Sequence, residues 1–392
     1  MRGVYELRTR GFSTAEFEAR LLRAQSIMTE DGFDAMVVCS PHNVRYFSGF
    51  DTQFWESPTR PWFVVVPASG ATIAVIPEIG APAMAATWVK DIRTWPSPRP
   101  GDDGTSLLAS VLSDLPRRSG RIGFELGREH SLRMPVVEFL SLRDLLPDLD
   151  LTNGSDCLWR IRMVKSEAEI AKIRHICAIA SETYENVPNL VSASDTEREA
   201  SRKLRIDLAR RGADSTPFLP CVSGPGGVAQ IVCGPGDRAF EDGDIVFFDT
   251  GSTFDGYFCD FDRNYSVGRI SDGALRAQAA VWQATEAGLD AARPGATTDE
   301  VFLAMAKVIE EAGSLGSNVG RLGHGLGLLL TEPPSHMPGD GTLIKPGMVL
   351  TIEPGMEYAP GKMIVHEEVV VVTEDGAALL TRRAPLEMQK LS

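Results

Sequence analysis

The feature that most constrains the fold of this chain is a set of acidic residues placed in apolar, strand-forming runs. They are Asp249 after IVFF, Glu353 after GMVLTI, and the neighbouring Glu367 and Glu368 between MIVH and VVVV. Apolar runs of this kind form buried strands, and a buried carboxylate without a partner is energetically costly. The chain must therefore fold so that these charges are compensated, and a divalent cation does so directly because it prefers oxygen ligands.

A further aspartate follows Asp249 at a spacing of eleven residues. The segment between them contains Gly251 and Gly256, so we expect a turn after Asp249 and then a strand over residues 257–265 that carries Asp260. Carboxylates on neighbouring strands can face each other across the pair. We therefore predict that Asp249 and Asp260 bind a metal ion together.

One histidine, His324, stands among glycines in the motif GHGLG. Glycines let the backbone approach another group closely, and imidazole is a common metal ligand. With the acidic residues it completes a set in the chain order Asp, Asp, His, Glu, Glu. Such a set suits two bridged metal ions, which can activate a water molecule and polarise a carbonyl group. A catalytic Glu353 can then carry the proton from that water to the leaving group.

The alternation of side chains along the strand that contains Glu367 and Glu368 does not decide which of the two faces the metal ions. It places His366 and Glu368 on one face of the strand and Glu367 on the other. Periodicity alone does not decide which face points toward the metal ions.

The remaining pattern predicts two domains, as does the length of 392 residues. In the first half the expected strands are 33–39, 63–66, 72–76 and 121–125, after a helix that follows Ser13. In the second half the expected helices are 167–185, which opens at a capping box of Ser166 and Glu169, then 196–211, 273–292 and 299–312. We therefore expect an α/β domain over residues 1–155 and an α+β domain with a curved antiparallel sheet over residues 156–392.

The composition makes several classes of partner poor candidates. The formal net charge is −14, and an acidic surface repels the phosphate backbone of nucleic acids. No stretch approaches the ~20 apolar residues that a membrane span requires, and the first residues contain no apolar signal core. The six cysteines are scattered without a CxxC pair, which is typical of reduced thiols in a cytoplasmic protein.

Taken together, the motifs resemble the pita-bread metallohydrolases, the family of creatinase, prolidase and methionine aminopeptidase. The motifs that carry the resemblance are the step from Asp249 to Asp260, GHGLG at His324, IEPG at Glu353, the late Glu367 before VVVVTEDG, RMVKS at 162–166 and NVRYFSG at 43–49. The resemblance covers nearly the whole chain, from Phe12 to about Arg383.

The resemblance implies a creatinase-like N-terminal domain, a pita-bread catalytic domain and two divalent metal ions. Manganese is the first choice of metal, and cobalt, zinc and iron are the alternatives. The implied ligands are Asp249, Asp260, His324, Glu353 and Glu367. A homodimer is also implied, in which the first domain of one subunit lies near the active site of the other.

Several positions depart from the prolidase pattern. Thr331 stands where aminopeptidase P and prolidase have a second histidine, and Gln230 or Ile231 lies near the place of another substrate histidine. The sequence DFDRN at 260–264 replaces the usual Asp-x-Thr-Arg-Thr. A threonine cannot carry a proton near neutral pH as imidazole can. The predicted substrate-binding residues are Thr331, Gln230, Arg263, His366 and Trp55, the last as an aromatic residue that can line the pocket of a partner subunit.

The predicted function is a dinuclear metal-dependent hydrolase of a small substrate with a C–N bond, and an Xaa-Pro dipeptide is the first candidate. The alternative is a lyase similar to the dimethylsulfoniopropionate lyases, which also lack the prolidase histidines. Those lyases have an additional metal-binding aspartate where this chain has Gly251. Hydrolases of other small metabolites, similar to creatinase and ectoine hydrolase, share the fold as well. A non-catalytic binding module is disfavoured because such modules lose ligands, whereas five are retained here.

Overall fold

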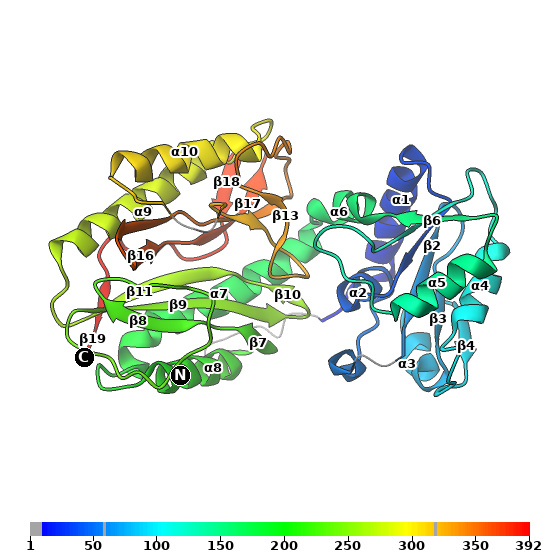
Figure 1. Cartoon of the computed structure of the whole chain (residues 1–392), viewed down its shortest axis with the longest axis horizontal. Coiled ribbons are helices and arrows are strands. Elements are labelled where there is room, and N and C mark those ends of the chain that lie inside the picture. Colours follow the sequence, from blue (N-terminus) through cyan, green and yellow to red (C-terminus); the bar gives the residue numbers. More distant parts are fainter. Residues whose placement is uncertain (1–9, 58–59, 317–319) are drawn as a thin grey trace. The chain divides into compact units, whose positions relative to one another are not determined.

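The computed structural model describes residues 10–57, 60–316 and 320–392. The chain divides into two compact units, Met1–Arg162 and Met163–Ser392 (Figure 1). The domain boundary predicted after residue 155 falls in the first turn of helix α6 (Ser155–Met163), most of which belongs to the N-terminal unit. Every helix in the described ranges is too short or too polar to cross a lipid bilayer.

The N-terminal unit is built around one mixed sheet. Its other elements are α1 (Thr14–Glu30), β1 (Ala35–Val38), α2 (Pro41–Ser48), η1 (Gln53–Glu56), β2 (Phe63–Pro67), β3 (Ile73–Pro77), η2 (Glu78–Gly80), α3 (Ala81–Ala85), β4 (Asp91–Trp95), α4 (Thr105–Ser113), β5 (Arg121–Phe124), α5 (Val136–Leu145) and β6 (Asp150–Asn153). The strand order is β4-β3-β2-β1-β5-β6. The pairs β1–β2 and β2–β3 are antiparallel, and the other pairs are parallel.

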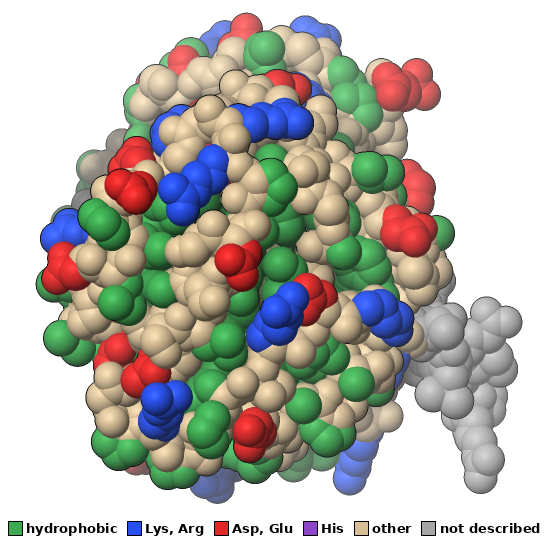
Figure 2. All heavy atoms as spheres, turned by 90° about the vertical axis from the view of Figure 1, so that its right-hand side faces the viewer, with side chains coloured by type: hydrophobic (Ala, Val, Ile, Leu, Met, Phe, Trp, Pro, Cys, Tyr) green, Lys and Arg blue, Asp and Glu red, His purple; other side chains and the backbone are tan. Residues whose placement is uncertain are grey.

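Apolar side chains cover both faces of this sheet. Leu108 and Leu112 of α4 and Phe139 of α5 pack against one face, while α1 and α2 contact β2. The strands β1 and β2 are consequently buried along their full length. Figure 2 looks onto this unit and shows acidic and basic side chains interspersed with apolar ones, so the described residues on this face form no patch of a single charge.

The C-terminal unit contains two larger sheets, a two-stranded sheet and two pairs of helices. Its elements are α7 (Glu167–Leu190), α8 (Glu197–Arg211), β7 (Ser215–Phe218), β8 (Cys221–Pro225), β9 (Asp244–Phe254), β10 (Tyr257–Phe258), β11 (Phe261–Val267), α9 (Asp272–Ala291), α10 (Thr298–Glu311), β12 (His324–Gly325), β13 (Glu332–Ser335), β14 (Val349–Ile352), β15 (Gly355–Ala359), β16 (Lys362–Val365), β17 (Glu368–Thr373), β18 (Gly376–Leu379) and β19 (Gln389–Leu391). One sheet has the order β10-β9-β11-β19, with β7 and β8 also paired to β9, and the other has the order β13-β12-β14-β17-β18.

The helix pairs cover the two sheets from outside. Helices α9 and α10 pack on the second sheet through an apolar cluster that includes Val281, Met305, Leu350 and Val370. Helices α7 and α8 contact β9 and β8 of the first sheet. Figure 1 shows the sheets of this unit between the two helix pairs.

Most of the predicted elements are confirmed. The carboxylate of Glu169 accepts the Ser166 N–H and the Ser166 hydroxyl accepts the Glu169 N–H, which opens α7 as predicted. The predicted strands 63–66 and 72–76 are β2 and β3, which pair antiparallel.

The prediction of a turn directly after Asp249 is wrong. The strand β9 continues through Phe254 because its second half pairs with β7 and β10. The predicted strand over 257–265 is in turn interrupted at Cys259 and Asp260, between β10 and β11.

Candidate metal centre

The five predicted metal ligands come from five segments of the C-terminal unit. They are Asp249 within β9, Asp260 between β10 and β11, His324 in β12, Glu353 directly after β14 and Glu367 directly before β17. Candidate ligand atoms of Asp260, His324 and Glu367 all lie within 4.8 Å of one another. We call these five residues the candidate metal centre.

The strand pair β9–β11 presents its carboxylates in an unexpected register. Asp249 pairs with Asp262, and Thr250 pairs with Phe261. Asp260 precedes the paired part of β11 and is therefore not the residue directly across from Asp249, although a side-chain hydrogen bond with Asp260 opposes the rise that burial causes in the pKa of Asp249 and so keeps the two carboxyls together. Asp260 and Asp262 are two positions apart, so their side chains point to the same face as that of Asp249.

The local backbone sets both the position and the protonation of His324. Gly323 has φ +128°, and a Cβ there would lie 2.3 Å from the carbonyl oxygen of Thr351. The Nδ1 of His324 lies 2.9 Å from the carbonyl oxygen of Gly325, so Nδ1 must carry the proton that it donates. The Nε2 is then unprotonated and lies 3.5 Å from a carboxylate oxygen of Asp260. Burial, aided by the charge of Arg321, lowers the pKa of His324 to about 3, so the ring is the neutral form that binds metals.

The two glutamates extend a second strand pair. Ile352 of β14 pairs with Glu368 of β17, so Glu353 and Glu367 follow side by side just beyond this ladder. The Glu353 N–H donates to the carbonyl oxygen of Leu322 at 3.0 Å, which ties this end of the pair to the segment before His324. Glu367 is 1% exposed, whereas Glu353 is half-buried.

Several carboxylates share this buried region. One oxygen each of Asp249, Asp260 and Glu367 has no hydrogen-bond partner among the described residues. Burial raises the pKa of these three carboxyls well above their usual values, and the charges of neighbouring carboxylates raise it further. Burial also raises the pKa of Glu353 to about 7. Buried acids that repel one another, beside a neutral imidazole, are a donor set that fits divalent metal ions.

Three of the predicted substrate-binding residues lie in loops or short helical segments. Thr331 directly precedes β13, and its hydroxyl accepts a hydrogen bond from Arg321 at 3.4 Å. The side-chain oxygen of Gln230 accepts the N–H groups of Val232 and Cys233 and so holds its own loop. Trp55 belongs to η1 of the N-terminal unit, and its indole N–H donates to Asp51. Their substrate-binding roles stay predictions.

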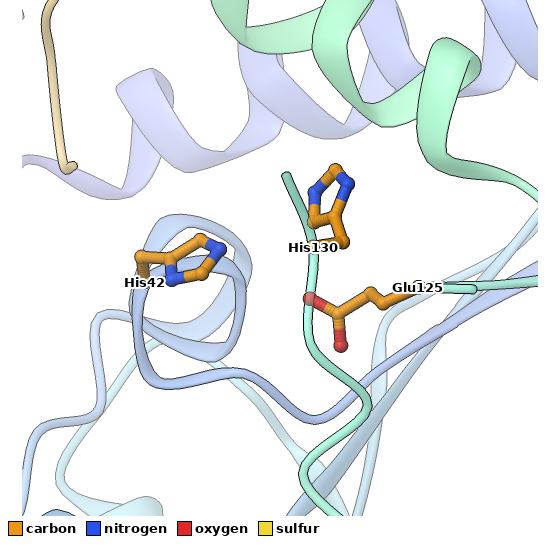
Figure 3. Close-up of side chains that lie close together, drawn as sticks. All are labelled: His42, Glu125 and His130. Carbon is orange, nitrogen blue, oxygen red and sulfur yellow. The ribbon is translucent and has the colours of Figure 1, made fainter. Parts of the chain in front are cut away.

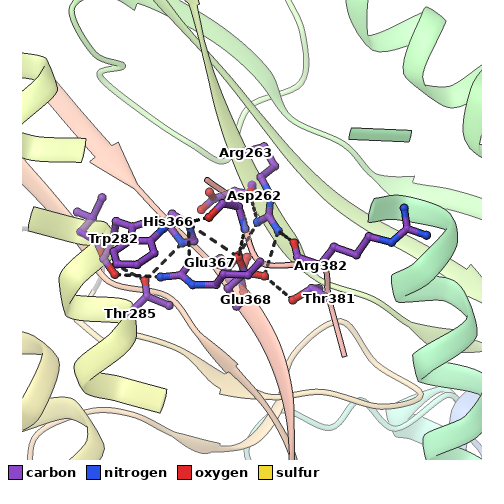
Figure 4. Close-up of polar contacts among 12 residues, drawn as sticks. Asp262, Arg263, Trp282, Thr285, His366, Glu367, Glu368, Thr381 and Arg382 are labelled. Atoms are coloured by element: carbon purple, nitrogen blue, oxygen red, sulfur yellow. Dashed lines mark hydrogen bonds and ion pairs between the residues drawn. The ribbon is translucent and has the colours of Figure 1, made fainter. Parts of the chain in front are cut away.

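The other two, Arg263 and His366, belong to a polar network around Glu368 (Figure 4). Arg263 donates to a carboxylate oxygen of Glu368 at 3.0 Å, and Arg383 bonds both Glu368 and the Nε2 of His366. His366 and Glu368 thus share one side of the strand, while Glu367 faces the other acids, which resolves the open alternation. Arg263 and His366 also line a cavity of about 190 Å³.

Sequence reasoning missed Arg321. Its charge opposes the rise that burial causes in the pKa of Asp260 and Glu353 and adds to the fall in the pKa of His324, so Arg321 acts electrostatically on the candidate metal centre. It is half-buried and forms no salt bridge with any residue in the described ranges. The arginine stands three residues before His324 in GRLGHG, but nothing in that local pattern indicates the direction of its side chain.

A second group of potential metal ligands lies in the N-terminal unit (Figure 3): His42, Glu125 and His130. The Glu125 carboxylate accepts the N–H groups of Cys39 at 2.6 Å and Ser40 at 2.9 Å, and also the side-chain amide of Asn43 at 2.6 Å. It further accepts the Ser40 hydroxyl. This carboxylate therefore anchors the start of α2, and its oxygens are already committed to donors.

Comparison with known proteins gives matches over both units. The family model described as metallopeptidase family M24 matches residues 171–374, and that of the creatinase/prolidase N-terminal domain matches residues 20–164. The probable dipeptidase PepE of Mycobacterium tuberculosis is 31% identical over 375 residues, which cover 94% of this chain and 95% of that protein. The Xaa-Pro dipeptidase of Pyrococcus furiosus is 27% identical over 371 residues, which cover 93% and 97%.

A solved structure agrees with these matches. The crystal structure of dipeptidase PepE from Mycobacterium ulcerans aligns with a TM-score of 0.83 at 31% identity, and the alignment covers 97% of this chain and 99% of that one. The M24 match spans more than half of the chain. With its buried carboxylates and neutral histidine, this chain belongs to metallopeptidase family M24, with a creatinase/prolidase domain at its N-terminal side, and is a metal-dependent peptidase.

Proposed function

We propose that the five residues of the candidate metal centre hold two divalent metal ions. Manganese is the first candidate, and cobalt, zinc and iron are the alternatives. The observation that carries this proposal is the buried set of carboxylate oxygens without partners beside the unprotonated Nε2 of His324. When bound, the ions supply Lewis acidity, which lowers the pKa of a water molecule and polarises a carbonyl group.

Glu353 is proposed as the catalytic proton carrier. It is the acid of this set that remains half-buried, whereas Asp249, Asp260 and Glu367 are at most 6% exposed. A carboxylate that solvent can reach is able to accept a proton from the attacking water and deliver it to the leaving nitrogen. This assignment makes Glu353 both a ligand and a proton carrier.

The proposed substrate is a dipeptide, with Xaa-Pro dipeptides as the first candidate. The mycobacterial relative is described as a probable dipeptidase and the Pyrococcus relative as an Xaa-Pro dipeptidase, and the alignments span more than 90% of each protein. Arg321 is a cation beside the centre without a salt bridge to any described residue, so we propose that it binds the substrate carboxylate. A homodimer in the cytoplasm is part of the same proposal.

Thr331 bears on how the leaving nitrogen is protonated. Its hydroxyl is held by Arg321 and cannot donate a proton near neutral pH as the histidine of other prolidases can. This supports the assignment of that step to Glu353.

The position of Gly251 does not support the lyase alternative. A Cβ at Gly251 would lie 2.3 Å from Leu330 Cδ1 and 3.0 Å from Phe218 Cβ. The additional aspartate of the dimethylsulfoniopropionate lyases therefore has no room here without a shift of both neighbours.

The test is release of free proline from a series of Xaa-Pro dipeptides by protein reconstituted with Mn²⁺, Co²⁺ or Zn²⁺. We expect metal-dependent release by the wild-type chain and loss of turnover in Glu353→Gln, since an amide cannot carry the proton. Rates like those of the wild type in Glu353→Gln would remove Glu353 from this role. Metal-loaded protein that leaves all dipeptides intact would contradict the dipeptidase proposal, and an alkene product from a small cationic acid would establish the lyase instead.

A further inference from the structure

Asp262 is a buried aspartate beside the candidate metal centre. It lies on β11 directly across from Asp249 on β9, and its side chain is on the same face as that of Asp260. The residue is 1% exposed. In the Asp-x-Thr-Arg-Thr pattern usual for prolidases a threonine occupies this position, so the carboxylate is a feature of this chain.

Neither carboxylate oxygen of Asp262 has a hydrogen-bond partner among the described residues. A buried carboxylate in that condition pays the full desolvation penalty unless a cation faces it. The adjacent cation is Arg263, but its guanidinium donates its hydrogen bonds to groups other than the Asp262 carboxylate. Its Nη1 donates to the backbone carbonyl oxygens of Asp262 and Glu367 at 2.6 and 2.9 Å. Its Nη2 donates to the carboxylate of Glu368 at 3.0 Å and to the carbonyl oxygen of Arg382 at 2.7 Å.

Another buried aspartate of the C-terminal unit, Asp255, differs from Asp262 because its carboxylate has an ion pair. Asp255, directly after β9, is 7% exposed, and its carboxylate lies 2.5 Å from the ammonium of Lys172. The carboxylate of Asp262 has no such ion pair with any described lysine or arginine. Figure 4 draws Asp262 within this polar network, where the guanidinium of Arg263 is engaged by Glu368. Asp262 is thus an acid among the proposed metal ligands whose carboxylate oxygens have no hydrogen-bond partner in the described residues.

We infer that Asp262 supplies an additional carboxylate ligand to the proposed pair of divalent ions. This inference rests on the proposed metal centre and extends it, since the cross-strand position beside Asp249 places the extra oxygens on the same face as two of its ligands. A further carboxylate makes the donor set richer in hard oxygen, which favours Mn²⁺ over softer, more thiolate- or imidazole-preferring ions.

The experiment compares Asp262→Asn, which keeps the shape and removes the charge, with Asp262→Thr, which installs the residue of the prolidase pattern. Full-length protein is stripped of metal and titrated with Mn²⁺ by calorimetry, and the metal content of the loaded protein is measured directly. We expect both variants to bind the ions at least about 10-fold more weakly than the wild type, because removing a group that only supports a metal ligand already costs about 10- to 100-fold. We also expect the visible spectrum of the Co²⁺-loaded protein to change, because the oxygen ligands of the ion change.

The matched control is Asp255→Asn, which removes a buried aspartate that has its own lysine. This variant is expected to lose stability and to keep the wild-type affinity for Mn²⁺. In metal-free protein, Asp262→Asn is expected to melt at a higher temperature than the wild type, since one repelling charge is gone. If Asp262→Asn does not fold, the Mn²⁺ affinity of Asp262→Thr tests the inference by itself.

The outcomes separate this inference from the proposed function. If the wild type binds two ions and both Asp262 variants bind them with unchanged affinity and an unchanged Co²⁺ spectrum, Asp262 is not a ligand and the metal centre stands. If the wild type itself binds no Mn²⁺, Co²⁺ or Zn²⁺, the proposed metal centre fails and the inference fails with it.

Discussion

The ammonium of Lys165 lies 3.0 Å from the carboxylate of Glu332, and the two side chains are 2% and 1% exposed. This pair joins the segment before α7 to the start of β13, directly after Thr331. Removing one partner leaves a buried charge without compensation, which typically costs about 3–5 kcal/mol.

The first prediction is therefore that Glu332→Gln lowers the free energy of unfolding by roughly 3–5 kcal/mol, measured by urea denaturation. The double variant Lys165→Met with Glu332→Leu should recover much of this loss, because it buries no charge. The matched control is Asp237→Asn, which removes an ion pair with Arg198 in which the aspartate is 81% exposed, and its effect on the free energy of unfolding should be small because solvent screens the pair. Equal effects of the buried and the exposed variant would contradict the argument.

The second prediction concerns metal removal. The carboxylates of the candidate metal centre repel one another when no cation is present, so chelation should lower the melting temperature and added Mn²⁺ should restore it. An ion at 100 times its dissociation constant stabilises the folded state by about 2.7 kcal/mol. The check is a thermal melt over a Mn²⁺ titration, with Ca²⁺ as the control ion. Identical melting curves with and without Mn²⁺ would count against the centre.

The third prediction concerns Arg321, the proposed receptor of the substrate carboxylate. Hydrogen bonds to charged groups contribute about 1.5–3 kcal/mol, so Arg321→Gln should raise KM for an Xaa-Pro dipeptide roughly tenfold or more. Metal content should not fall, since the guanidinium is not a ligand. A dipeptide amide, which lacks the terminal carboxylate, should bind both proteins equally. A similar loss for the acid and the amide would mean that Arg321 acts on the metal centre rather than on the substrate.

The fourth prediction is a pH dependence in the N-terminal unit. Burial by itself would raise the pKa of Asp34, but the N–H groups of Gly120, Arg118 and Ser119 donate to its carboxylate and lower it below the usual value. Its contribution to stability is therefore complete above the unfolded pKa of about 4 and is lost as the pH falls through the lower folded pKa.

Hydrogen exchange checks this prediction. At neutral pH, Asp34→Asn should speed the exchange of the Ser119 and Gly120 amides, and the difference from the wild type should shrink as the pH falls below about 4. A difference that persists unchanged into strong acid would show that the carboxylate charge is not the cause.

Local interactions explain why many elements could be predicted from the sequence. The capping box of Ser166 and Glu169 joins residues three apart, so the start of α7 is visible in the printed chain. The alternation that separates Glu367 from His366 and Glu368 follows equally from strand geometry, although the inward face had to be seen in the fold. The family motifs supplied the identities of the five proposed ligands, and candidate ligand atoms of three of them, Asp260, His324 and Glu367, lie within 4.8 Å of one another.

The register of β9 and β11 could not be read in the same way. Asp249 pairs with Asp262 because β9 runs on to Phe254, and β9 does so because β7 and β10 pair with its second half. Such pairing depends on segments distant in the chain. Arg321 was not predicted as a functional residue for a similar reason. The direction in which a side chain points from a loop depends on how that loop packs.

The sequence by itself determined the kinds of donor, their order along the chain and the strands and helices that carry them, because these depend on residue type and short-range spacing. Only the tertiary structure decided which carboxylate faces Asp249, that Arg263 is engaged by Glu368 rather than by Asp262, and that Arg321 lies beside the centre. Those relationships arise from strand register and from the burial of charge, and both depend on contacts between residues far apart in the chain.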